Sequence, residues 1–248
     1  MQRIKRRIFS GVVCEQEVYT YERTRQDRSS EPRLRFKTEE ERLQHKLNIS
    51  RRKHARLVNE NFSPSSLYST LTFNQENECH DYTECKILRD RYFRRLKRKY
   101  PDAVIFIYIG RGKNTNRFHV HMLSEGIPEE YVLKQWTYGD VNRVVHLREH
   151  NTYEGVDRGQ DYTALANYLF EHWEPEAGPH RWKATRNAKQ PQKEEPTVCK
   201  RTYNEKNVPV APKGYVLVEI QATKYGYFYY KYVLDPKLQH GSRKKKRM

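Results

Sequence analysis

Apolar and polar residues follow regular patterns through the middle of the chain and indicate four β-strands. Each candidate strand is a short run rich in β-branched and aromatic residues, bounded by turn-forming or charged residues. The four runs are LYSTLTF (67–73), AVIFIYIG (103–110), RFHVHMLS (117–124) and VNRVVHL (141–147). The second run is apolar throughout, which predicts a central, buried strand. The turn sequence RGKNTN predicts that the second and third runs pair as a hairpin.

Three other segments have the pattern of helices. Residues 83–100 carry apolar residues at helical spacing with basic residues on the opposite face, and Pro101 ends the pattern. Residues 128–136 begin with a proline at a first-turn position, followed by two acidic residues. Residues 159–173 have leucines four residues apart.

These elements follow one another in the order β-α-β-β-α-β, and a further helix comes after them. That order predicts an α+β fold with a ferredoxin-like or RRM-like antiparallel sheet and helices on one face. Right-handed crossovers in such a sheet place the first and third strands in its centre. Residues 117–124 should therefore lie beside residues 67–73.

The sequence on either side of this block predicts extensions. Residues 1–62 are rich in charge and take on a helical pattern from Thr38, which predicts a basic, partly helical lead-in without a core of its own. The block itself is expected to be one domain over residues 63–174. The expected later segments are a charged, proline-rich linker (175–213), an aromatic C-terminal β-hairpin (214–236) and a basic tail (237–248).

The charge of the chain favours a polyanionic partner. The formal net charge is +17, from 48 Lys and Arg residues against 31 Asp and Glu residues. Neutralising phosphates releases counterions and increases affinity, although a structural RNA-binding protein would have a similar charge. Arg111, Lys113 and Arg117 flank the predicted strand 117–124 and are the best-placed candidates to contact a DNA backbone.

Several features of the sequence indicate a cytoplasmic protein. No apolar run approaches the roughly 18 to 20 residues that cross a bilayer, so no membrane contact is expected. The basic N-terminal segment lacks the apolar stretch of a signal peptide. The four cysteines are scattered without a CxxC pair, which is typical of reduced thiols in the cytosol.

Two histidines in the third predicted strand are candidate metal ligands. Successive side chains in a strand point to opposite faces, so His119 and His121 share one face while Phe118 and Val120 share the other. Two imidazoles one pleat apart can bind one ion, and a protein core seldom holds two adjacent histidines without partners. From the residues alone, a metal site and a pair of hydrogen-bonded histidines both remain open.

A metal beside a basic surface suggests phosphate chemistry, because the ion can act as a Lewis acid on a phosphoryl oxygen. Such chemistry needs a nucleophile. Tyr168 lies in the last predicted helix, on a face shared with Ala164 and His172, whereas Tyr162 points elsewhere. Most tyrosines on helices serve only in packing. Tyr168 is therefore a candidate whose role depends on the histidine pair.

Three short motifs, which follow one another along the chain, resemble the motifs of the HUH endonucleases. The likeness is strongest to the rolling-circle replication initiators (Rep proteins) of bacterial plasmids, phages and mobile elements. The first motif of that family is a strand ending much like STLTFN (69–74), and the second is His-hydrophobic-His, matched by His119-Val120-His121. The third is a helix with the nucleophilic tyrosine in a sequence such as L-A-K-Y-L, similar to LANYL (165–169). The resemblance covers roughly residues 40 to 173.

The resemblance implies a specific activity. His119 and His121, with a third ligand, would hold Mg²⁺ or Mn²⁺ at the scissile phosphate of single-stranded or origin DNA. Tyr168 would attack that phosphate, leaving a 5′-phosphotyrosyl link and a free 3′-hydroxyl, so that the strand can later be rejoined. The sequence has no helicase P-loop, so a host helicase and a DNA polymerase are expected partners.

The resemblance leaves the third metal ligand open. Members of the family often have a glutamate where this chain has Gly110, nine residues before the first histidine. Glu76, His80 or His172 could supply the ligand instead.

Two other interpretations fit parts of the sequence. A relaxase or single-tyrosine transposase of the same superfamily would keep the chemistry, although relaxases usually have a third histidine and a tyrosine near the N-terminus. Residues 224–232 (KYGYFYYKY) resemble the aromatic strand of an RNA-recognition motif, in which exposed rings stack on bases. A non-enzymatic RRM-like nucleic-acid-binding protein would account for the charge without any role for Tyr168.

Overall fold

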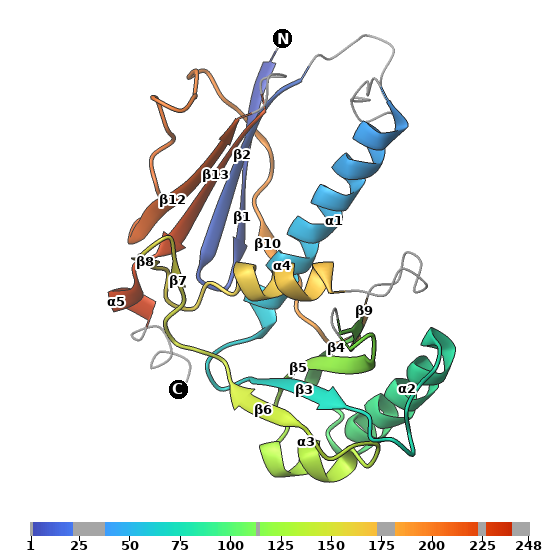
Figure 1. Cartoon of the computed structure of the whole chain (residues 1–248). Helices are drawn as coiled ribbons and strands as arrows, with labels where there is room; N and C mark the ends of the chain where they lie inside the picture. Colours follow the sequence, from blue (N-terminus) through green and yellow to red (C-terminus); the bar gives the residue numbers. More distant parts are fainter. Residues whose placement is uncertain (1, 22–37, 113–114, 173–181, 223–226, 240–248) are drawn as a thin grey trace. The chain divides into compact units, whose positions relative to one another are not determined.

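Figure 1 shows the computed structural model of the chain, an α+β protein with antiparallel sheets. The structure describes residues 2–21, 38–112, 115–172, 182–222 and 227–239. The chain forms two compact units: unit 1 comprises Met1–Asn59, His150–Asp161 and Gln190–Met248, and unit 2 comprises Glu60–Glu149 and Tyr162–Lys189. The histidine pair and Tyr168 belong to unit 2.

The described sheet of unit 2 has the strand order β6-β3-β5-β4-β9, and every neighbouring pair is antiparallel. Its strands are β3 (Leu67–Thr72), β4 (Val104–Arg111), β5 (Phe118–Glu125), β6 (Arg143–His146) and β9 (Trp182–Ala184). The first four agree with the predicted strands to within two residues. The prediction that the histidine strand lies beside residues 67–73 is confirmed, because β5 pairs with β3.

Three helices of unit 2 agree with the sequence patterns, namely α2 (Tyr82–Lys99), α3 (Glu129–Gln135) and α4 (Thr163–Glu171). Asp81 caps α2, where its side chain accepts a hydrogen bond of 2.9 Å from the backbone N–H of Glu84. None of the helices that the structure describes combines the length and apolar character needed to cross a membrane.

The helices cover both faces of this sheet. On one face, Ile107 of β4 and Val120 of β5 are buried in a core with Tyr92 of α2 and Val132 of α3. α4 lies on the opposite face (Figure 1), where the Tyr168 ring is 5.8 Å from that of His121. This differs from the expectation of helices on one face. The physical reason is that the second face also carries large side chains that need cover, namely Phe106, Tyr108 and Leu123.

The sheet of unit 1 brings together both ends of the described chain. β1 (Gln2–Ser10) and β2 (Val13–Tyr21) form a hairpin, and β2 also pairs with β13 (Phe228–Leu234). β13 pairs with β12 (Tyr215–Ala222), which confirms the predicted C-terminal hairpin. The hairpin is part of a larger sheet rather than an isolated element.

The sequence predicts a basic, partly helical lead-in over residues 1–62, whereas the structure begins with two strands, β1 and β2. The helix predicted from Thr38 is present as α1 (Glu39–Asn61), but the strands before it were missed. Their pattern is obscured because β2 buries charged residues: Glu15 and Glu17 both accept hydrogen bonds from Arg56 of α1. A buried ion pair resembles a solvent-exposed surface in a hydropathy pattern.

The expected linker, residues 175–213, contributes short strands to both units. β9 pairs with β4 in unit 2, whereas β10 (Gln192–Lys193) and β11 (Thr197–Val198) pair with β1 in unit 1. Strands of two or three residues are too short to produce a detectable alternation. The remaining described elements of unit 1 are β7 (Thr152–Tyr153), β8 (Val156–Asp157) and α5 (Pro236–Gln239). The expected basic tail from residue 240 onward lies outside the described residues.

We expect Gly11→Ala to destabilise the protein more than Gly155→Ala. Both glycines have positive φ values, 57° and 77°, which cost an alanine about 1–2 kcal/mol. A Cβ on Gly11 would also lie 2.1 Å from the backbone oxygen of Asn59, whereas a Cβ on Gly155 would meet no atom within 4 Å. This clash should add about 1–3 kcal/mol. Urea unfolding of both variants measures the difference, and equal losses would contradict the close contact at Gly11.

Candidate metal centre and nucleophile

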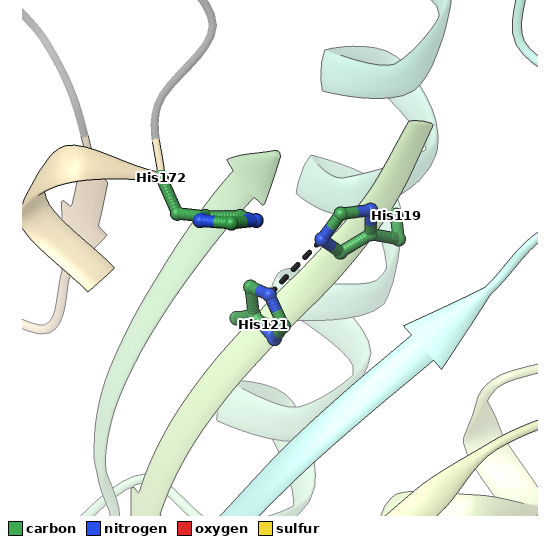
Figure 2. Close-up of side chains that lie close together, drawn as sticks. All are labelled: His119, His121 and His172. Atoms are coloured by element: carbon green, nitrogen blue, oxygen red, sulfur yellow. Dashed lines mark hydrogen bonds between the residues drawn. The ribbon is translucent and has the colours of Figure 1, made fainter. Parts of the chain in front are cut away.

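His119 and His121 project from β5 on the same face of the sheet, as strand alternation predicts (Figure 2). Their Nε2 atoms lie 3.0 Å apart and share a hydrogen bond. His121 is buried, and His119 is partly buried. The two ring nitrogens are close enough to act on one ion when the proton between them is displaced.

His172 completes a cluster of three imidazoles. It is the C-cap of α4, and its ring centroid lies 5.7 Å from those of His119 and His121. Figure 2 shows His172 reaching from the end of the helix toward the two histidines of the strand. One ligand nitrogen from each ring lies within 4.8 Å of the other two. Glu76 and His80, the other third ligands considered from the sequence, do not belong to this group.

Gly110 leaves space for the His172 ring. It is the residue opposite His119 in the pairing of β4 with β5. A Cβ at this position would lie 3.1 Å from Nε2 of His119 and 3.2 Å from Cδ2 of His172. A side chain at position 110 would therefore compete with both imidazoles for the same volume.

Two hydroxyl groups of β3 orient His121. Its Nδ1 lies 3.0 Å from Tyr68 Oη and 3.2 Å from Thr70 Oγ1. The Tyr68 and His121 rings also stack, with centroids 5.6 Å apart. Hydrogen bonds at Nδ1 fix the ring and leave Nε2 for an ion. No motif in the sequence marks either hydroxyl, although the alternation of LYSTLTF places Tyr68 and Thr70 on a single face.

Burial favours the uncharged form of both strand histidines. Burial, and then the neighbouring His119 and His172 rings, lowers the pKa of His121 to about 3. Burial, and then His172, lowers the pKa of His119 below its ordinary value of 6.5. Metal ions bind the neutral imidazole, so both rings are in the form that a ligand requires at neutral pH.

Tyr168 stands beside the cluster, one helical turn before His172 on α4. Its ring centroid lies 4.6 Å from that of His172 and 5.8 Å from that of His121. The side chain is 43% exposed, so a substrate can reach it. Partial burial raises the pKa of its phenol above 10.0. Activation of this oxygen would therefore require a positive charge from a metal or a neighbouring residue.

Tyr162 occupies a different environment. It is buried at 1% exposure, and its hydroxyl donates a hydrogen bond of 3.0 Å to the backbone oxygen of Arg148. This partner and the burial account for Tyr162 as a packing residue at the start of α4.

The described candidates for DNA binding have other contacts. Arg111 follows Gly110 in β4 and points to the opposite face of the sheet, where its guanidinium lies 4.3 Å from the ring centroid of Phe118. Arg117 pairs with Glu78 at 2.7 Å. Lys113 lies outside the described residues.

Arg143 is a further cation near the site, and no motif in the sequence marks it. It is exposed on β6 opposite Thr70, and Thr70 is in turn opposite His121, so the three residues share one face. Burial raises the pKa of Tyr68, and the charge of Arg143 acts in the other direction. The guanidinium is therefore within electrostatic reach of the hydroxyl that orients His121.

The aromatic strand β13 does not present the tyrosines that a base-stacking surface needs. Tyr229, Tyr230 and Tyr232 are buried, with at most 4% exposure. Their hydroxyls donate hydrogen bonds to Glu15 and to the backbone oxygens of Asn204 and Pro209. The rings of Tyr230 and Tyr232 belong to the hydrophobic core of unit 1.

The site thus combines three imidazoles, an exposed phenol and a guanidinium on one face of a sheet. Such a set can bind a divalent ion and a phosphate and can hold an oxygen nucleophile beside them. No protein-family model, no curated protein and no solved structure matches this chain.

Proposed function

We propose that this protein nicks and rejoins single-stranded DNA as a rolling-circle replication initiator of the HUH type. The observation that carries the proposal is the position of Tyr168 next to the imidazole cluster, 5.8 Å from His121 between ring centroids. The tyrosine and the histidine pair come from separate motifs that the resemblance links. A partly exposed phenol beside candidate metal ligands is the arrangement that nucleophilic attack on a phosphate requires.

In the proposed reaction, the phenol oxygen of Tyr168 attacks the phosphorus and the bond from phosphorus to the 3′-oxygen breaks. The phenol loses its proton to water, and the departing 3′-oxygen gains one. The products are a 5′-phosphotyrosyl link and a free 3′-hydroxyl, and reversal rejoins the strand without ATP. His119, His121 and His172 would hold the divalent ion, which would polarise a phosphoryl oxygen.

The strand order supports the proposed ferredoxin-like arrangement. The block predicted from the sequence corresponds to β3-α2-β4-β5-α3-β6, and its strands lie in the order fourth, first, third, second. This order has the first and third strands in the middle, as right-handed crossovers require. We propose that β9 extends this sheet and that α4 supplies the nucleophile to its second face.

The proposed cellular role is initiation of replication in a plasmid, phage or other mobile element. The free 3′-hydroxyl would serve a DNA polymerase, and a host helicase would unwind the duplex. The net charge of +17 suits a DNA substrate. A relaxase or transposase would use the same chemistry on a different DNA. A non-enzymatic RRM-like binder is less favoured, because three tyrosines of its expected stacking strand are buried.

The proposal is tested by incubating the purified protein with single-stranded DNAs labelled at either end, in Mn²⁺ or Mg²⁺. The 3′-labelled fragment should migrate with the protein on a denaturing gel, because the 5′-phosphate of that fragment is linked to tyrosine. The 5′-labelled fragment should be released with a 3′-end that a polymerase can extend. A chelator should abolish both products. Tight, salt-sensitive binding without cleavage of any DNA would favour the non-enzymatic binder.

We expect Tyr68→Phe to weaken metal binding about tenfold. The change removes the hydroxyl that contacts Nδ1 of His121 but keeps the stacked ring, and Thr70 retains the second hydrogen bond. Losing a group that orients a ligand costs about 10- to 100-fold in affinity, and the retained bond favours the lower end. Calorimetric titration of the metal-stripped protein measures this. Tyr131→Phe, which alters a residue packed against the core on the other face, is the control.

A further inference from the structure

We propose that His172 is the third metal ligand and that the resulting site binds Zn²⁺ or a similar transition-metal ion in preference to Mg²⁺. The inference rests on the proposed metal site, but it does not depend on the nicking reaction. The sequence predicts Mg²⁺ or Mn²⁺, and the proposed preference differs from that expectation with respect to Mg²⁺.

The ligand set carries the argument. In the part of the chain that the structure describes, the side chains close enough to share an ion are His119, His121 and His172, without a carboxylate. Mg²⁺ is usually held by carboxylates, phosphates and water, whereas imidazoles favour Zn²⁺, Ni²⁺ and related ions. Three protein ligands with a further open position are typical of catalytic zinc. Three neutral ligands would also leave the full charge of the ion to attract a phosphate.

The packing around Gly110 favours His172 over a carboxylate on β4. Even a Cβ at position 110 would lie 3.2 Å from Cδ2 of His172 and 3.1 Å from Nε2 of His119, tighter than ordinary contact. A longer acidic side chain there would need the volume that His172 occupies. The glycine on β4 and the histidine at the end of α4 are therefore complementary.

The position of His172 also connects the metal to the nucleophile. The backbone N–H of His172 donates a hydrogen bond of 2.9 Å to the backbone oxygen of Tyr168 and so caps the helix. An ion held by His172, His119 and His121 would join the end of α4 to β5. Metal binding would then help to fix the position of Tyr168.

The first test measures metal preference with the full-length, metal-stripped protein. Co²⁺ should bind with visible absorption of a nitrogen-ligated site and without the near-ultraviolet band of thiolate ligation, which controls for the four buried cysteines. One equivalent of Zn²⁺ should displace Co²⁺, whereas Mg²⁺ in about 100-fold excess should not. Displacement of Co²⁺ by Mg²⁺ and Zn²⁺ at similar concentrations would overturn the proposed preference.

The second test asks whether His172 is a ligand. His172→Ala and the larger His172→Gln should each weaken Co²⁺ and Zn²⁺ binding by at least about 100-fold, since even groups that only orient a ligand contribute up to that amount. His146→Ala alters an exposed histidine on β6 and should change nothing. Circular dichroism confirms that the variants fold, and His172→Gln preserves most of the side-chain volume. Unchanged affinity in a folded His172 variant would overturn the assignment.

The two proposals fail in different ways. If folded His172 variants keep both metal affinity and the covalent DNA product, the third ligand is wrong and the nuclease proposal stands. If Co²⁺ and Zn²⁺ binding depends on His172 but no DNA is ever cleaved, the metal site stands and the nuclease proposal fails.

Discussion

Tyr168→Phe should reduce formation of the covalent protein–DNA product by at least about 1,000-fold, because losses on removing a nucleophile reach this range and beyond. The change deletes only the attacking oxygen. The ring that lies 4.6 Å from His172 between centroids is retained, so the helix and the imidazole cluster should be undisturbed. The affinities for DNA and for metal should therefore remain within about twofold of those of the unaltered protein, because removing one exposed hydroxyl group has little effect on the rest of the structure.

A single-turnover assay with 3′-labelled DNA measures the covalent product, and titrations measure the two affinities. Tyr162→Phe is the matched control: its hydroxyl is buried and bonded to the backbone of Arg148, so the product should persist. Persistence of the product in Tyr168→Phe would contradict the assignment. Tyr68 would then be the next candidate, because its hydroxyl also lies at His121, and the double variant would decide.

The sheet of unit 2 could be predicted because its pattern is local. Each strand alternates or is wholly apolar, each helix has its own periodicity, and right-handed crossovers limit the ways to connect them. Unit 1 could not be predicted in the same way. Its sheet pairs β2 near the start of the chain with β13 near the end. Nothing in a local pattern indicates such a partner, and the buried Glu15 and Glu17 disguise β2 as polar.

The candidate site also combines features that a local pattern predicts with features that depend on distant parts of the chain. Spacing alone places His119 and His121 on one face, and the resemblance selects Tyr168. The role of His172 cannot be read from the sequence, because it depends on the end of α4 lying on the face of the sheet from which the histidines of β5 project. The position of Arg143 beside Thr70 follows from the register in which β6 pairs with β3. The sequence of a single strand does not show that register. Arg111 directly follows Gly110, which pairs with His119. Successive side chains of a strand point to opposite faces, so Arg111 points away from the histidines.

Arg56→Met should destabilise the protein by about 3–5 kcal/mol at neutral pH, because it removes the guanidinium from two buried carboxylates and leaves Glu17 with Arg6 and Glu15 with the Tyr229 hydroxyl. Arg56 of α1 donates hydrogen bonds to Glu15 and Glu17, and all three side chains are at most 10% exposed. Methionine keeps much of the length and volume but carries no charge. Arg52→Met, one helical turn earlier, is the control. The Arg52 guanidinium is partly exposed and stacks on the Tyr229 ring, so its loss should lower the free energy of unfolding by only about 1 kcal/mol.

The effect of Arg56→Met should depend on pH in a definite direction. Burial raises the pKa of Glu17, but Arg6 and Arg56 lower it by more, so its folded-state pKa lies below the ordinary 4.5. A carboxyl with a lowered pKa contributes stability above its unfolded pKa and loses it as the pH falls through the folded value. Urea unfolding should therefore show the largest difference between the two proteins at pH 7 and a shrinking one below about pH 4.5. A difference that stays constant with pH would mean that Arg56 stabilises unit 1 through the packing of its side chain and not through its charge.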